Sequence, residues 1–172
     1  MTVTLVLGGA RSGKSGFAQR AAELAARGER TVMIATGQAF DDEMADRIAR
    51  HQAGRGESWT TVEAPFELAA AIAGIPSDAA AVVDCLTLWL SNHMLAGHDL
   101  EALSTELVEA VAACRARLWL VSNEVGLGIV PETPLGRRFR DEAGRLNQRL
   151  AATADEVYFL AAGLPLRMKP HA

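Results

Sequence analysis

The sequence lacks the features that mark several large classes of protein. It has only two cysteines, Cys85 and Cys114, in 172 residues. They show no metal-ligand spacing, which argues against a disulfide scaffold and favours two buried thiols. No apolar run approaches the roughly 20 residues that a membrane span needs, and no cleavable leader precedes the first apolar segment. The net charge of −4 gives no general attraction to nucleic acid. We therefore expect a cytoplasmic protein without a transmembrane segment or a nucleic-acid partner.

What the chain does contain is a regular alternation of two hydrophobic patterns. Short, continuously apolar segments typical of buried strands alternate with segments of helical periodicity. This alternation predicts an α/β fold, a mostly parallel sheet with helices on both faces, in a single domain over residues 1–172. The expected strands are 2–7, 31–35, 59–62, 80–84, 118–122 and 157–160, and the expected helices are 14–26, 41–51, 66–73, 86–95, 100–115 and 135–152. Residues 125–134 read as a loop, and 165–172 read as a loose tail.

A phosphate-binding loop is the most specific motif. Residues 8–15 fit the pattern G-x-x-x-x-G-K-[ST] between an expected strand and an expected helix, where backbone N–H groups and the helix N-terminus can hold phosphate oxygens. A tight glycine turn with this spacing by chance is the competing interpretation. The loop predicts nucleotide contacts from eight residues: Gly8, Gly9, Ala10, Arg11, Ser12, Gly13, Lys14 and Ser15.

A magnesium site is expected beside this loop. The Ser15 hydroxyl is a potential Mg²⁺ ligand, and Lys14 can reach the β- and γ-phosphates. Asp84 ends a buried strand, the position where proteins with this loop hold Mg²⁺. The alternative for Asp84 is an N-cap of the helix that follows.

The motifs found or missing elsewhere in the sequence narrow the class of reaction that the phosphate loop can serve. The Asn-Lys-x-Asp motif of signalling GTPases is absent, and the chain is too short for a motor or a transporter ATPase. These absences leave two expected reaction classes, a small-molecule kinase and a nucleotidyltransferase.

His51 lies on one expected helix face with Arg47, and Arg50 and Arg55 flank it. A neutral imidazole can attack phosphorus while guanidinium groups hold the phosphate. The residue types alone favour the alternative, an exposed histidine at a helix end.

Several segments together resemble one family, the adenosylcobinamide kinase / adenosylcobinamide-phosphate guanylyltransferases of cobalamin biosynthesis. The resemblance covers nearly the whole chain, and its most specific parts are the acidic Asp-Asp-Glu-Met segment leading to Arg50-His51 and the Asn-Glu-Val-Gly segment. The matching segments are residues 8–15, 34–36, 41–44, 47–48, 50–51, 54–55, 59, 63, 84–87, 123–126, 128–131, 139–141, 144, 147–148 and 154–155.

The resemblance implies a bifunctional enzyme. A nucleoside triphosphate, ATP or GTP, would phosphorylate the corrinoid adenosylcobinamide. GTP would then donate GMP to that phosphate through a guanylylated histidine, and His51 is the matching position, so the resemblance outweighs the structural interpretation of His51. It also implies a RecA-like fold, a homotrimer, and further nucleotide contacts from Ala35, Thr36, Gly37, Gln52, Ala53, Gly54, Arg55, Glu63 and Asp84.

Two other functions stay open at this stage. The first is a P-loop kinase of another small metabolite, with a structural His51, and the second is a non-catalytic module that senses nucleotide.

Three further residues have more than one interpretation each. Glu124 is a catalytic base, a group that hydrogen-bonds to the ligands of the metal, or a turn anchor. Trp59 and Trp89 either contact the corrinoid or pack in the core.

Overall fold

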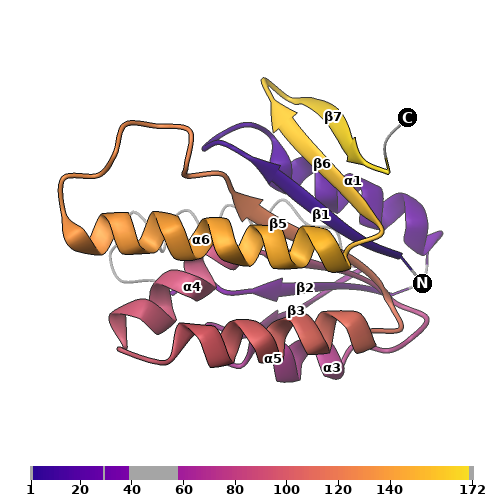
Figure 1. Cartoon of the computed structure of the whole chain (residues 1–172). Helices are drawn as coiled ribbons and strands as arrows, with labels where there is room; N and C mark the ends of the chain where they lie inside the picture. The colour runs from indigo at the N-terminus through magenta and orange to yellow at the C-terminus, as the bar shows by residue number, and fades with distance from the viewer. Residues whose placement is uncertain (1, 29, 39–57, 171–172) are drawn as a thin grey trace.

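One seven-stranded sheet organises the molecule (Figure 1). The computed structural model describes residues 2–28, 30–38 and 58–170. The strand order is β3-β2-β4-β5-β1-β6-β7, and every neighbouring pair is parallel except β6 with β7. The strands are β1 Thr2–Gly8, β2 Thr31–Ala35, β3 Trp59–Glu63, β4 Ala80–Asp84, β5 Arg117–Asn123, β6 Glu156–Ala161 and β7 Leu164–Lys169.

Helices cover both faces of this sheet. They are α1 Lys14–Ala26, α3 Leu68–Ala73, α4 Leu86–Leu95, α5 Leu100–Ala113 and α6 Pro134–Thr153. In the described part of the chain α1 packs on one face, while α3, α4, α5 and α6 pack on the other. Within the described ranges no helix is long and apolar enough to cross a membrane. The expected α/β architecture with a mostly parallel sheet is confirmed.

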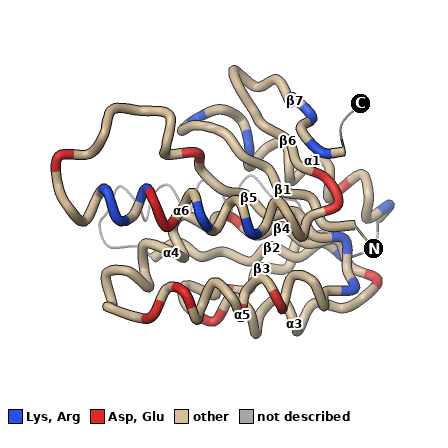
Figure 2. The backbone as a smooth tube through the Cα atoms, in the orientation of Figure 1, with Lys and Arg blue, Asp and Glu red and all other residues tan. Residues whose placement is uncertain are grey.

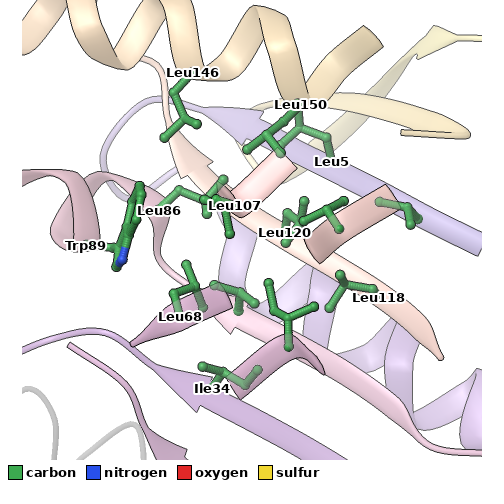
Figure 3. Packing of buried hydrophobic residues seen from close by; sticks show 14 of the residues in the cluster. Leu5, Ile34, Leu68, Leu86, Trp89, Leu107, Leu118, Leu120, Leu146 and Leu150 are labelled. Carbon is green, nitrogen blue, oxygen red and sulfur yellow. The ribbon is translucent and has the colours of Figure 1, made fainter. Parts of the chain in front are cut away.

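The two faces are packed differently. On the α1 face the buried contacts come from Ala18, Ala22 and Ala26, spaced four residues apart, so the helix backbone can approach the strands closely. The opposite face is built from large side chains, as Figure 3 shows around Leu118 and Leu120 of β5. Lys14 begins the alanine stripe of α1 and is itself buried, so the packing of α1 carries this lysine to the sheet.

The prediction of a loose tail over residues 165–172 is wrong. Residues 164–169 form β7, which pairs antiparallel with β6 through the two-residue turn Ala162–Gly163. Both turn residues have positive φ, 52° and 81°, as a tight hairpin turn requires. The strand carries Pro165 at the sheet edge, where a missing N–H is tolerated. A proline at an edge position is thus compatible with a strand.

The other expected helices and strands are confirmed with small shifts at their ends, apart from the expected helix over residues 41–51. Strand β5 is longer than expected at both ends, and α3 begins at Leu68 rather than at Phe66. The expected helix over residues 41–51 lies outside the described residues. Cys85 and Cys114 are buried free thiols, as the absence of metal-ligand spacing predicts.

A pair of histidines, buried His93 and exposed His98, joins α4 to the turn before α5. His93 Nε2 lies 3.1 Å from the Phe66 carbonyl oxygen, which can only accept, so Nε2 carries the proton. Nδ1 of neutral His93 then accepts from Nδ1 of His98, at 2.8 Å. Burial lowers the pKa of His93, although the Phe66 bond and the charges of Glu67 and Glu106 act in the opposite direction. The folded state therefore favours the neutral imidazole.

This pair predicts a loss of stability in mild acid. Unfolded His93 titrates near about pH 6.5, whereas folded His93 takes up its proton only at lower pH. The stabilisation is therefore present above about pH 6.5 and is lost as the pH falls below it. We expect the urea midpoint to fall between about pH 7 and about pH 5, and to fall less steeply in His93→Gln. Equal slopes for the two proteins would contradict this assignment.

Candidate nucleotide-binding site

The residues of the expected phosphate loop connect β1 to α1 at the carboxyl edge of the sheet. Gly13 occupies the N-cap position of α1 with φ 93°, and no side chain caps the helix. The N-terminal turn of α1 therefore faces the loop with its backbone N–H groups and the positive end of its dipole, the arrangement that binds phosphate. Arg11 has φ 55° and is exposed at the surface of the loop.

Lys14 is folded back over the loop. Its Nζ donates to the Gly9 carbonyl oxygen at 2.6 Å and lies 3.5 Å from Ser12 Oγ, and the residue is only 6% exposed. These neutral acceptors hold the ammonium group within the loop. A phosphate oxygen would form a stronger, charge-assisted bond with the same group. Lys14 is thus kept at the place where a bound phosphate would need it.

The turn between β6 and β7 supports the loop from behind. Gly163 N–H donates to the Ser12 carbonyl at 3.0 Å. A Cβ on Gly13 would lie 3.3 Å from Gly163 Cα, and a Cβ on Gly8 would lie 2.4 Å from the Leu160 carbonyl oxygen. Two of the motif glycines are therefore required by close packing as well as by backbone angle. Sequence reasoning missed this support because it took the residues of β7 for a tail.

A network of buried polar groups holds the neighbouring strand ends together. Thr36 Oγ1 donates to the Cys85 carbonyl at 2.7 Å and accepts from the Cys85 N–H at 2.9 Å. Thr87 Oγ1 lies 3.1 Å from Cys85 Sγ and accepts from Asn123 Nδ2 at 2.8 Å. Asp84, directly before Cys85, is thereby fixed at the carboxyl end of β4, between the end of β2 and the end of β5.

The thiol in this network is inert. Burial, and then the negative charge of Asp84, raise the pKa of Cys85, so the group stays protonated at neutral pH. Asn92 of α4 extends the network by donating to the carbonyls of Thr36 and Pro65, at 2.9 and 3.0 Å. Cys85 and Asn92 therefore serve the geometry of the strand ends rather than redox or nucleophilic chemistry.

Comparison with known proteins places this chain in a family. The family described as cobinamide kinase / cobinamide phosphate guanyltransferase matches residues 4–168. The bifunctional adenosylcobalamin biosynthesis protein CobP of Pseudomonas aeruginosa is 48% identical over 172 residues, which cover 96% of each chain. The proteins named CobU from Salmonella typhimurium and Escherichia coli are 42% and 41% identical over 96% of this chain and 98% of theirs.

The chain belongs to the cobinamide kinase / cobinamide phosphate guanyltransferase family. Among solved structures, an ATPase domain aligns with a TM-score of 0.50 at 14% identity, over 92% of this chain and 68% of that one, which supports the P-loop ATPase fold. The P4 protein of bacteriophage phi6, in complex with ADP, aligns with a TM-score of 0.47 at 14% identity over 95% of this chain, which spans about half, 52%, of the P4 chain.

Most of the residues expected to form this family's site come together. Thr36 directly follows Ala35, whose partners in the sheet are Glu63 on one side and Asp84 on the other. Gly8 pairs with Asn123 across β1 and β5. The phosphate loop, the ends of β2, β3 and β4, and Gly37 thus share one edge of the sheet. Five expected residues lie outside the described part of the chain: His51, Gln52, Ala53, Gly54 and Arg55.

Glu124, Trp89 and Trp59, which have more than one interpretation each, all make structural contacts. Glu124 Oε1 accepts from the Gly126 N–H at 2.6 Å, the contact expected of a turn anchor. Trp89 is buried and donates from Nε1 to the Phe66 carbonyl. Trp59 packs partly buried beside the α1 face and donates to Glu23 Oε1. The sequence assigned no role to Thr87 or Asn92. A polar residue in an apolar helix pattern does not indicate which distant group it hydrogen-bonds to.

Removing the hydroxyl of Thr36 tests the network. The substitution Thr36→Val keeps the shape but leaves the buried N–H and carbonyl of Cys85 without this partner. We expect a loss of about 1–3 kcal/mol in the free energy of unfolding, measured by urea denaturation, together with weaker nucleotide binding. Thr60→Val, on an exposed edge position, is the matched control and should change neither. An unaltered unfolding free energy in Thr36→Val would refute the network's role.

Proposed function

We propose that the chain catalyses two successive reactions on one corrinoid. A nucleoside triphosphate first phosphorylates the terminal hydroxyl of adenosylcobinamide. GTP then donates GMP to adenosylcobinamide phosphate, which yields adenosylcobinamide-GDP and pyrophosphate. The observation that carries the proposal is the similarity to bifunctional relatives over nearly the full chain, together with a phosphate loop assembled for nucleotide binding. The same observation disfavours both a kinase of an unrelated metabolite and a sensor without catalysis.

The kinase step depends on positioning and on charge. The N-terminal turn of α1 and Lys14 hold the phosphates of the donor, and Lys14 offsets the negative charge that is shared among the transferred oxygens. We expect this step to depend on aligning the acceptor hydroxyl with the γ-phosphorus inside a site that already supplies positive charge.

The residues also suit a magnesium ion. In the described ranges no group of three or more His, Cys, Asp or Glu side chains could form a protein-only metal site. Mg²⁺ does not need one, because it binds one or two protein oxygens together with phosphate oxygens and water. Ser15, in the first turn of α1, and Asp84 would hold it. When bound, the ion supplies charge neutralisation at the phosphates.

The transferase step uses His51 as a nucleophile. A neutral imidazole nitrogen attacks the α-phosphorus of GTP, and a nitrogen–phosphorus bond forms. The bond from that phosphorus to the bridging oxygen breaks, and pyrophosphate leaves with the electron pair. A phosphate oxygen of adenosylcobinamide phosphate then attacks the same phosphorus, and the electron pair of the nitrogen–phosphorus bond returns to the imidazole. Arg50 and Arg55, near His51 in the sequence, supply charge for the phosphate.

The assembly and location belong to the same proposal. From the family resemblance we infer a homotrimer with the corrinoid as its small-molecule partner, and from the sequence we infer that it works in the cytoplasm.

Covalent labelling tests the histidine. Wild-type protein incubated with Mg²⁺ and GTP labelled at the α-phosphate, without corrinoid, should retain label after denaturation. The label should survive alkali and be lost in acid, as a phosphoramidate is. His51→Ala should retain none, while His98→Ala, which changes an exposed histidine, should label as the wild type does. Equal labelling of His51→Ala would exclude His51 as the nucleophile.

A magnesium titration tests Asp84. We expect Asp84→Asn to raise the Mg²⁺ concentration for half-maximal kinase activity by about tenfold or more, because an amide oxygen is a weaker ligand than a carboxylate. Asp78→Asn, at an exposed position just before β4, is the control and should titrate like the wild type. A titration curve for Asp84→Asn that superimposes on that of the control would remove Asp84 from the metal site.

A further inference from the structure

The segment between β5 and α6 exposes large apolar side chains. Leu127 is 82% exposed, Ile129 98% and Val130 57%. Single exposed apolar residues are common, but three within four positions form a patch of the kind that marks a binding surface. We call residues 124–133 the apolar loop. In Figure 1 it stands away from the body of the molecule before it enters α6.

The apolar loop is held at both ends. At its start the Glu124 N–H donates to the Gly8 carbonyl at 2.9 Å, and the Glu124 side chain ties down Gly126. At its end Arg137 Nη1 donates to the carbonyls of Pro131 and Glu132, at 3.0 and 2.7 Å. The exposed side chains are thus presented by a braced segment, so a ligand that covers them meets a partly organised surface.

Next to the apolar loop lies an open hollow with a polar lining. Its volume is about 500 Å³, and Gly126 forms one side of it. The other side is the outer face of α6, where a Cβ added to Gly144 would meet nothing within 4 Å. Figure 2 colours basic and acidic positions along the backbone of this helix. The remaining lining residues are Arg140, Asp141, Arg145 and Gln148.

The arginines of the hollow can exchange partners. Arg145 Nη1 lies 2.7 Å from Glu142 Oε1, and Arg140 Nε lies 3.6 Å from Asp141 Oδ1. Glu142 and Asp141 are neighbours on the same helix, and such surface pairs contribute little free energy. The guanidinium groups can therefore donate to amide carbonyls or to a phosphate that enters the hollow.

The apolar loop is continuous with the nucleotide site. Its first residue hydrogen-bonds to Gly8, the first residue of the phosphate loop, and Gly8 pairs with Asn123, the last residue of β5. In parallel α/β sheets ligands bind outside the carboxyl ends of the strands. A molecule seated on the apolar loop therefore lies beside the phosphates of the donor nucleotide, where the acceptor of a transfer reaction belongs.

We propose that the apolar loop and the hollow on α6 bind the corrinoid acceptor of both reactions. This inference rests on the proposed function. A corrin is a broad macrocycle with methyl-covered faces and amide arms, which suits an open, apolar surface bordered by hydrogen-bond donors. Leu127, Ile129 and Val130 contact the ring. Arg140, Arg145 and Gln148 receive the amide arms, while the arm that ends in the hydroxyl extends to the phosphate loop.

The test measures the binding of adenosylcobinamide and the molar mass of the protein. Equilibrium dialysis of the protein with adenosylcobinamide, followed by its visible absorbance, gives the dissociation constant without any reaction. We expect Leu127→Ser and Ile129→Ser each to weaken binding by about tenfold, as loss of a buried apolar side chain implies. Leu24→Ser is the matched control, since Leu24 is 80% exposed near the end of α1 and should bind as the wild type does.

Further measurements distinguish a failure of the proposed corrinoid site from a failure of the proposed function. Labelling by GTP without corrinoid should be unchanged in both loop variants, and so should the molar mass from light scattering. Arg140→Gln should also weaken corrinoid binding. Unchanged binding in Leu127→Ser and Ile129→Ser would overturn the inference, and a lower molar mass in them would overturn it in favour of a contact between copies of the chain. If the wild-type protein binds no adenosylcobinamide, the proposed function itself fails.

Discussion

The parallel pairing of β1 with β5 and β6 is the constraint on which the site depends. It sets the end of β1 beside Asn123 on one side and Leu160 on the other, so the chain must turn sharply at Gly8. There is no room for side chains at Gly8 and little at Gly13 because Leu160 and the Gly163 turn approach so closely. The loop that results has an uncapped helix N-terminus and a buried lysine, and both favour phosphate. The packing of the sheet thus determines where phosphate can bind.

The second constraint is the polar network around Cys85. Buried N–H and carbonyl groups need partners, and at this edge the strand ladders have stopped. Thr36 Oγ1 supplies the partner for the Cys85 N–H and carbonyl. Thr87 Oγ1 lies within hydrogen-bond distance of the Cys85 thiol and accepts from the Asn123 side chain. The network joins β2, β4 and β5 at the level of Asp84. A site for charged ligands is therefore stabilised by neutral polar groups.

The sequence predicted most of the fold because a buried parallel strand is continuously apolar and its helices are periodic. It failed at β7, whose residues were expected to form a loose tail but pair with β6 at the sheet edge. At the site, the phosphate loop could be predicted because its glycines, lysine and serine have a fixed spacing. Thr87 and Asn92 could not, since their role depends on contacts between distant segments. The position of His51 lies outside the described residues, so its role stays a prediction.

The central claim is that one carboxyl edge carries out two successive transfers to the same corrinoid. The most direct measurement is mass spectrometry of adenosylcobinamide incubated with the purified protein, ATP, GTP and Mg²⁺, sampled over time. The account predicts that the corrinoid first gains one phosphate and that this species then gains GMP, with release of pyrophosphate. Hydrolysis of nucleotide with no change in the mass of the corrinoid would contradict it, and so would phosphorylation that never proceeds to the GDP adduct.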